Sequence, residues 1–319
     1  MNRKISTGAL TEGAILSALT ALLGIISYYI PFLTLLIFIW PIPIIILGKK
    51  HGLGVSVLAT ISAGILLSLF TPLLYSVPII LMYGTLGIIL GYGYYKNVSI
   101  LKTILGGYFV SLLSTIILLQ FYSMFTGINI MTEITQTMRL AMEEVGNVYN
   151  AMGMDMTTLE GATKQMEDMI NQMAQLFPAT LILIPAIVTM INMIASGKII
   201  KRLGYDISEV PPFREWRLPN YASIGLFLII TIAILGQYLS IPSFDIVYRN
   251  LLYLTFILFT VQGLSFVAKY FHTKGFSKGF TIASVVMVFL IPIVHTVVQL
   301  LGLVDVVFNL RDKIKINEG

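Results

Sequence analysis

The sequence has no cysteine, only three histidines, and charged residues at just 11% of its 319 positions. The lack of cysteine excludes disulfides, thiolate metal ligands and cysteine nucleophiles. The histidines, His51, His272 and His295, are scattered, and neither a His-Glu-x-x-His run nor a complete phosphate-binding glycine loop is present. Because acid–base catalysis needs suitably paired titratable groups, we predict that the protein is not an enzyme and has no metal or other cofactor.

Apolar residues, by contrast, make up 57% of the chain, whereas soluble domains are roughly half apolar and a quarter charged. Between Gly13 and Gly48 there is no charged residue, a run too long for one membrane crossing of about 20 residues. Pro31 interrupts this run at a place suited to a tight reversal, so we expect two spans here. The composition predicts an all-α polytopic membrane bundle in contact with the lipid bilayer.

Charge-free runs predict nine spans along the whole chain. They cover residues 8–30, 32–48, 52–70, 73–95, 103–127, 175–198, 219–240, 249–269 and 279–303.

Basic residues occupy alternate turns between these spans, which predicts a multi-pass protein of the bacterial cytoplasmic membrane with a cytoplasmic N-terminus. With Arg3 and Lys4 inside, the even-numbered turns hold Lys49, Lys50, Lys96, Lys102, Lys198, Lys201, Arg202, Arg214, Arg217, Lys269, Lys274 and Lys278. Nine spans would place Arg311, Lys313 and Lys315 outside, so eight spans, with one short early segment re-entrant, are the alternative. The net charge of +5 follows this topology and does not indicate nucleic acid.

A long hydrophilic insertion, residues 129–172, separates the fifth and sixth spans. It has seven acidic residues against Arg139 and Lys164, and nine of the fifteen methionines lie between positions 131 and 173. Apolar residues recur at helical spacing on both sides of Gly153. We therefore predict two amphipathic helices outside the cytoplasm, hinged near Gly153 and lying on the membrane or over the spans.

The loop 204–220, between the sixth and seventh spans, has an aromatic and basic centre. Pro211, Pro212 and Pro219 bracket Phe213, Arg214, Trp216 and Arg217. Prolines favour a short, non-helical connection, and Trp is typical of the membrane–water interface. Arg214, Trp216 and Arg217 are the predicted partner-docking residues.

Polar residues inside spans are costly and are functional candidates. Gln120 and Tyr122 fall near the outer end of the fifth span, and His295 and Gln299 share one face of the ninth by their i, i+4 spacing. These four are the predicted substrate-binding residues, for an unidentified small molecule. The structural alternative is an ion pair between Asp245 and Arg249, with the other polar groups in hydrogen bonds between helices.

Two resemblances extend this interpretation. Ala14-x-x-x-Ala18, the prolines Pro41 and Pro43, and the segment LGKKHGLGVSVLATISAGIL at 47–66 resemble the opening of the S components of energy-coupling-factor transporters. Over its full length, with FREWRLP at 213–219 and GLVDVVFNLR at 302–311, the chain resembles the YybS family of uncharacterised bacterial membrane proteins.

The S-component resemblance implies a six-helix module made of residues 1–128 and 173–203, with both ends cytoplasmic. It also implies that Ala14 and Ala18 face a membrane-embedded coupling subunit. The insertion 129–172, the cytoplasmic loop 204–220 and the additional C-terminal spans and tail at 221–319 would then be separate parts.

Two functions follow from the sequence. The first is a substrate-binding subunit that docks on a separate coupling subunit with its ATPases, since the chain has no nucleotide site. The alternative is a non-transporting scaffold or regulator that binds envelope or cytoplasmic partners through the insertion 129–172 and the loop at 213–219. A proton-driven transporter that uses His295 is a third, weaker interpretation.

Overall fold

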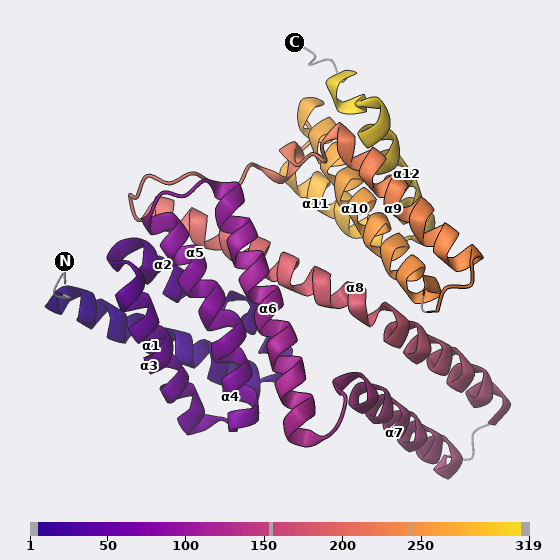
Figure 1. Ribbon diagram of the computed structural model, residues 1–319, viewed down its shortest axis with the longest axis horizontal. Helices are drawn as coiled ribbons and strands as arrows, with labels where there is room; N and C mark the ends of the chain where they lie inside the picture. The colour runs from indigo at the N-terminus through magenta and orange to yellow at the C-terminus, as the bar shows by residue number, and fades with distance from the viewer. Residues whose placement is uncertain (1–5, 153–155, 243, 314–319) are drawn as a thin grey trace. The chain divides into compact units, whose positions relative to one another are not determined.

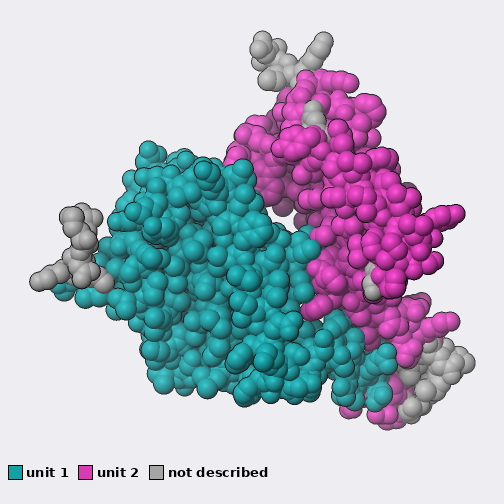
Figure 2. Space-filling view, viewed as in Figure 1, with its two compact units in different colours: residues 1–143, 180–210 teal, residues 144–179, 211–319 magenta. Residues whose placement is uncertain are grey.

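The computed structural model describes residues 6–152, 156–242 and 244–313, and the regular elements in these ranges are helices (Figure 1). Eight helices are long and apolar enough to cross a membrane. The predicted all-α polytopic fold is therefore confirmed. Contacts divide the chain into two compact units, one of residues 1–143 and 180–210 and the other of residues 144–179 and 211–319 (Figure 2).

The first unit contains the first five spans and the C-terminal part of the sixth. Its elements are α1 (Thr7–Tyr29), η1 (Pro31–Ile39), α2 (Ile42–His51), α3 (Leu53–Phe70), α4 (Leu73–Ile79), η2 (Ile80–Gly84), α5 (Thr85–Tyr95), α6 (Ile100–Thr126) and parts of α7 and α8. The second span begins as the 3₁₀-helix η1 and continues as α2. The fourth contains Pro78, which cannot donate a helical hydrogen bond, and passes through the π-helical turn η2.

Small residues set the packing of α1. Gly13, Ser17 and Ala21 are buried, and the Ser17 hydroxyl donates to the Ala59 carbonyl on α3 at 3.1 Å. A face of small side chains lets two membrane helices approach closely.

The interior of the first unit is filled by large apolar side chains. Those with the least exposure include Trp40, Leu47, Leu67, Leu86, Leu90 and Met193. Asn192 adds a polar contact within this core, because its Nδ2 donates to the Phe38 carbonyl at 2.7 Å. The centre of this unit is thus a packed core.

The insertion consists of α7 (Ile130–Ala151) and the beginning of α8 (Met156–Arg202). Gly153, the expected hinge, lies outside the described residues. The second amphipathic segment does not form a separate helix, because α8 is one helical element of 47 residues that extends from the insertion into the sixth span. Its 47 residues are more than twice the about 20 that one crossing needs. Part of α8 therefore projects beyond the membrane.

The second unit contains η3 (Phe213–Glu215), α9 (Asn220–Tyr238), α10 (Phe244–Thr273), α11 (Lys278–Leu290), α12 (Pro292–Phe308) and η4 (Leu310–Lys313). The expected ninth span, 279–303, is not one straight helix, because α11 and α12 meet at 110°. Ile291 has the extended conformation that a residue before proline favours. With 13 and 17 residues, the two helices are about 20 and 25 Å long, and neither spans a bilayer core of about 30 Å.

The end of α12 shows how this broken pair is arranged. Arg311 and Asp312 contact Trp216 and Arg217, which directly precede α9. Since α9 and α10 each have the length of one crossing, the start of α9 and the end of α10 lie on the same side of the membrane. We therefore predict that the pair α11–α12 enters and leaves the membrane on that side as a re-entrant hairpin. The irregular segment is at the C-terminal end of the chain, and the early segment Pro31–His51 is long enough to span.

Two glycines allow α10 and α12 to cross closely. A Cβ atom on Gly302 would lie 1.9 Å from the Phe259 carbonyl oxygen, and one on Gly263 would lie 1.9 Å from that of Val298. Both obstacles are backbone atoms, so no side-chain rotation relieves them.

We expect Gly302→Ala to destabilise the second unit by about 3 kcal/mol, the upper range for overpacking a well-packed site. Equilibrium unfolding in mixed micelles measures this loss. Gly225→Ala on α9 is the matched control, because its Cβ would meet nothing within 4 Å. Equal stability of the two variants would contradict the close crossing.

Candidate docking loop

The loop that precedes α9 is short and held by its own local contacts. Pro212 leads into the single 3₁₀ turn η3, after which Trp216 returns to an extended conformation. The Trp216 indole Nε1 donates to the Pro211 carbonyl at 2.9 Å. The rings of Phe213 and Trp216 pack edge to face, with centroids 5.1 Å apart. The prolines and the aromatic pair therefore give the loop one defined shape.

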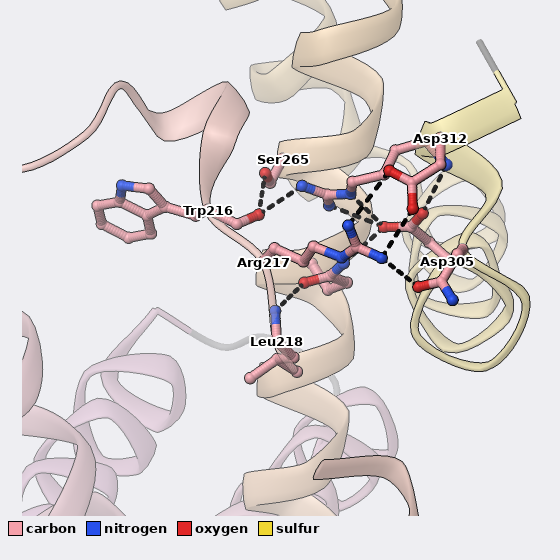
Figure 3. Close-up of polar contacts among 9 residues, drawn as sticks. Trp216, Arg217, Leu218, Ser265, Asp305 and Asp312 are labelled. Atoms are coloured by element: carbon pink, nitrogen blue, oxygen red, sulfur yellow. Dashed lines mark hydrogen bonds and ion pairs between the residues drawn. The ribbon is translucent and has the colours of Figure 1, made fainter. Parts of the chain in front are cut away.

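The loop backbone is anchored on α10 and on the tail (Figure 3). The Trp216 carbonyl accepts hydrogen bonds from the Ser265 hydroxyl at 2.7 Å and from Arg311 Nη1 at 2.8 Å. The Leu218 amide donates to Gln262 Oε1 at 2.9 Å. These bonds satisfy backbone groups at a point where the chain has no helix of its own.

The Arg311 side chain that bonds the loop is itself held by a buried ion pair with Asp305. The Asp305 and Arg311 side chains are 0% and 3% exposed. Arg311 Nε donates to Asp305 Oδ2 at 2.8 Å, and Nη2 lies 2.7 Å from the same oxygen, without hydrogen-bond alignment. Asp305 also accepts from the Arg311 amide and from Gln262 Nε2. The carboxylate is thus fully paired, as a buried charge must be.

A second ion pair, which is exposed, joins the loop to η4. Arg217 donates to both carboxylate oxygens of Asp312, at 3.2 and 3.0 Å, and also to Asn309. Arg214 has no hydrogen bond or ion pair within the described ranges. In Figure 3 the Trp216 indole points away from the ionic cluster, while its carbonyl points into it. The loop backbone is thus fixed within the chain, whereas Phe213 is exposed and Arg214 and Trp216 are partly exposed.

The chain matches a known protein family over most of its length. A family model described as "Predicted membrane protein (DUF2232)" matches residues 18–306. The chain belongs to this family. It is also 27% identical over 313 residues to the "Uncharacterized protein YybS" of Bacillus subtilis, covering 97% of this chain and 99% of that protein. No solved structure matches.

Membership of the DUF2232 family confirms the full-length YybS resemblance. Two segments that carried the resemblance, 213–219 and 302–311, are the two that meet in the anchored loop. Within 302–311, Gly302 permits the helix crossing, Asp305 and Arg311 form the buried pair, and Asn309 ends α12 in the left-handed conformation.

The other predicted docking residues lie on the first unit of this DUF2232 protein. Ala14 and Ala18 are exposed on α1, and Ala14 lines a groove between α1 and α3 together with the buried Gly13 and Ser17. They are therefore accessible, and their role in docking stays a prediction.

The four predicted substrate-binding residues fall in both units. In the first, Gln120 is exposed, whereas Tyr122 is half-buried and donates a hydrogen bond to Glu133. Tyr122 also lines an apolar groove of about 190 Å³ between α4 and α6, and Gln120 does not line it. In the second unit, His295 and Gln299 are half-buried on α12.

The structural alternative for the polar residues holds only in part. Gln262 and Asn192 do bond between elements. Asp245 and Arg249, however, are both exposed and form no ion pair with each other.

Two further polar contacts were missed by sequence reasoning. The Glu12 carboxylate bonds Lys50 and lies 2.8 Å from His51 Nε2, which joins the start of α1 to the end of α2. From the sequence, Glu12 is only an acidic residue near a helix N-terminus, and Lys50 and His51 are part of a basic turn about forty positions later. Their contact depends on how the first three spans pack, which no local pattern shows.

In the second missed contact, the Asn250 side chain on α10 bonds to backbone groups of α8. Asn250 Oδ1 accepts from the Ala179 amide, and Asn250 Nδ2 donates to the Gln175 carbonyl, both at 2.8 Å. These are the two groups that would bond each other in an uninterrupted helix. Asn250 thus inserts into the helix ladder beside Pro178, a known cause of local bending. An Asn within an apolar run was the only available signal.

Proposed function

We propose that the protein is a non-transporting membrane scaffold that holds a partner protein on the loop 204–220. The observation that carries this proposal is the anchored loop, whose backbone is fixed by a buried ion pair while the Trp216 indole points away from the ionic cluster and packs on the exposed Phe213 ring. Preorganised loops lose little entropy on binding, and Trp and Arg are the residues that most often dominate binding energy. The Lys and Arg distribution supports a cytoplasmic position for this loop and for the N-terminus.

A packed interior also favours the scaffold over a transporter. The centre of the first unit is filled by Trp40, Leu47 and Leu90, each with 0% exposure. The buried charges of the second unit are used to fix the loop. We infer that the chain itself performs no catalysis.

The test is partner capture from the native membrane. After chemical crosslinking, the tagged wild-type chain should retain a specific protein, and the double variant Arg214→Ala with Trp216→Ala should retain it at least about tenfold less, as loss of a Trp hot spot implies. Tyr221→Ala is the control, since Tyr221 is a nearby aromatic residue in the first turn of α9 that is 76% exposed. A chain that purifies alone, or equal capture by all three proteins, would overturn the scaffold.

The second function is a substrate-binding subunit of a transporter energised by a separate ATPase pair. The groove beside Tyr122 favours it, because this groove could take an apolar part of a ligand. In that case Ala14→Leu should release the coupling subunit and its ATPases, since a larger side chain would block close helix approach. Small-molecule uptake separates the two functions, because the variant Arg214→Ala with Trp216→Ala should lose the partner of a scaffold without any change in uptake.

A further inference from the structure

A polar cavity of about 440 Å³ opens in the first unit, at the ends of α2 and α5, and its lining includes none of the proposed docking residues Arg214 and Trp216. Its polar lining is Lys49, Tyr94, Asn97, Asp206 and Ser208. A pocket of this volume is within the range of small-molecule sites.

One wall presents a positioned cation. The Lys49 ammonium donates to the Tyr94 carbonyl at 2.9 Å and to Asn97 Oδ1 at 3.1 Å. An ammonium has three protons, so one remains for a ligand, as does the amide nitrogen of Asn97. Tyr94 is itself fixed, because its buried hydroxyl donates to the Met193 carbonyl at 3.1 Å.

Another part of the lining contains an acidic residue. It is formed by residues 206–208, which follow α8 without helical structure. Tyr205 and Ile207 pack on the apolar core of this unit, whereas Asp206 and Ser208 between and after them are exposed. Neither the Asp206 carboxylate nor the Ser208 hydroxyl has a partner within the described part of the chain, and Asp206 does not form an ion pair with Lys49.

A cation and an anion that face one cavity without pairing match a ligand that carries both charges. A simple anion would be repelled by Asp206, and a simple cation by Lys49. The cavity also lies at the ends of the candidate spans that contain α2 and α5, with Val98 and Ile100 in its lining, and the ends of spans are where lipid headgroups are expected. A primary amine can donate hydrogen bonds to Asp206 and Ser208, which a quaternary ammonium cannot do.

We propose that this cavity binds an aminoalkyl phosphate group, with the phosphate on Lys49 and Asn97 and the primary amine on Asp206 and Ser208. Such a group occurs as the headgroup of phosphatidylethanolamine and as free phosphoethanolamine.

Native mass spectrometry of the full chain tests the proposal. After incubation with equal amounts of phosphatidylethanolamine, phosphatidylcholine and phosphatidylglycerol, we expect the first to be retained about tenfold over the others, the effect of one hydrogen bond to a charged group. Asp206→Asn should abolish the preference over phosphatidylcholine, and Lys49→Gln should lower retention of all three. Glu209→Gln is the control, because Glu209 is exposed on the same segment and pairs with Lys201 instead.

The two sources are separated by adding free phosphoethanolamine to protein loaded with phosphatidylethanolamine. Displacement at micromolar concentration indicates a soluble ligand, and retention of the lipid indicates the headgroup; both support the proposal. Equal retention of the three lipids by the wild type, or a preference that Asp206→Asn leaves intact, would overturn it.

Discussion

Asp305→Ala is expected to destabilise the second unit by about 3–5 kcal/mol, the cost of leaving one partner of a buried ion pair uncompensated. The Arg311 guanidinium would remain, 3% exposed, with no carboxylate to neutralise it. Because Arg311 also donates to the Trp216 carbonyl, the loop should detach as well. Equilibrium unfolding in mixed micelles measures the stability, and the rate of trypsin cleavage after Arg214 and Arg217 measures release of the loop.

Two variants make this result specific. Asp312→Ala breaks the exposed pair with Arg217, whose partners are 34% and 56% exposed, and should cost less than about 1 kcal/mol. The double variant Asp305→Leu with Arg311→Met removes both buried charges and should recover most of the stability, while the loop stays cleavable because Trp216 has lost a donor. A similar loss for Asp305→Ala and Asp312→Ala would show that the buried pair does not anchor the loop.

The spans were predictable because bilayer thickness fixes how long an apolar run must be. Charge-free runs therefore located α1, α3 and α6 to within a few residues of their ends. The same reasoning treated 279–303 as one helix, since hydropathy does not register the bend that Pro292 introduces after Ile291. It also ended the insertion at 172, although α8 continues through that position, because an amphipathic pattern can pass into an apolar one without a break in the helix.

The docking loop was predictable in composition and not in its contacts. Trp216 and Arg217 were expected as free docking residues, yet the Trp216 carbonyl and the Arg217 guanidinium are bound within the chain. Their partners, Arg311 and Asp312, lie 95 positions away. No local sequence pattern shows a pairing over this distance. The pairing also requires that α11–α12 bring residues 311 and 312 back to the side of the membrane on which the loop lies.

If α11–α12 is a re-entrant hairpin, the side from which introduced cysteines react with a membrane-impermeant reagent is fixed for each position. The chain has no cysteine, so each introduced cysteine is its only thiol. We expect Glu215→Cys, Lys274→Cys and Lys313→Cys to react with a membrane-impermeant maleimide from one side of sealed vesicles, and Leu239→Cys to react only from the other. The reason is that one crossing by α9 separates 215 from 239, one by α10 separates 239 from 274, and α11–α12 adds no crossing.

A fifth position tests the depth of the hairpin. Ile293 lies at its bend, just after Pro292, and is 73% exposed. In a re-entrant hairpin this exposed side chain contacts lipid, so Ile293→Cys should resist the impermeant reagent from both sides and react with a membrane-permeant maleimide. If α11 and α12 instead cross the membrane together, Lys313→Cys will be labelled from the same side as Leu239→Cys. That outcome would also be incompatible with the anchored loop, since Arg311 could not then reach the Trp216 carbonyl.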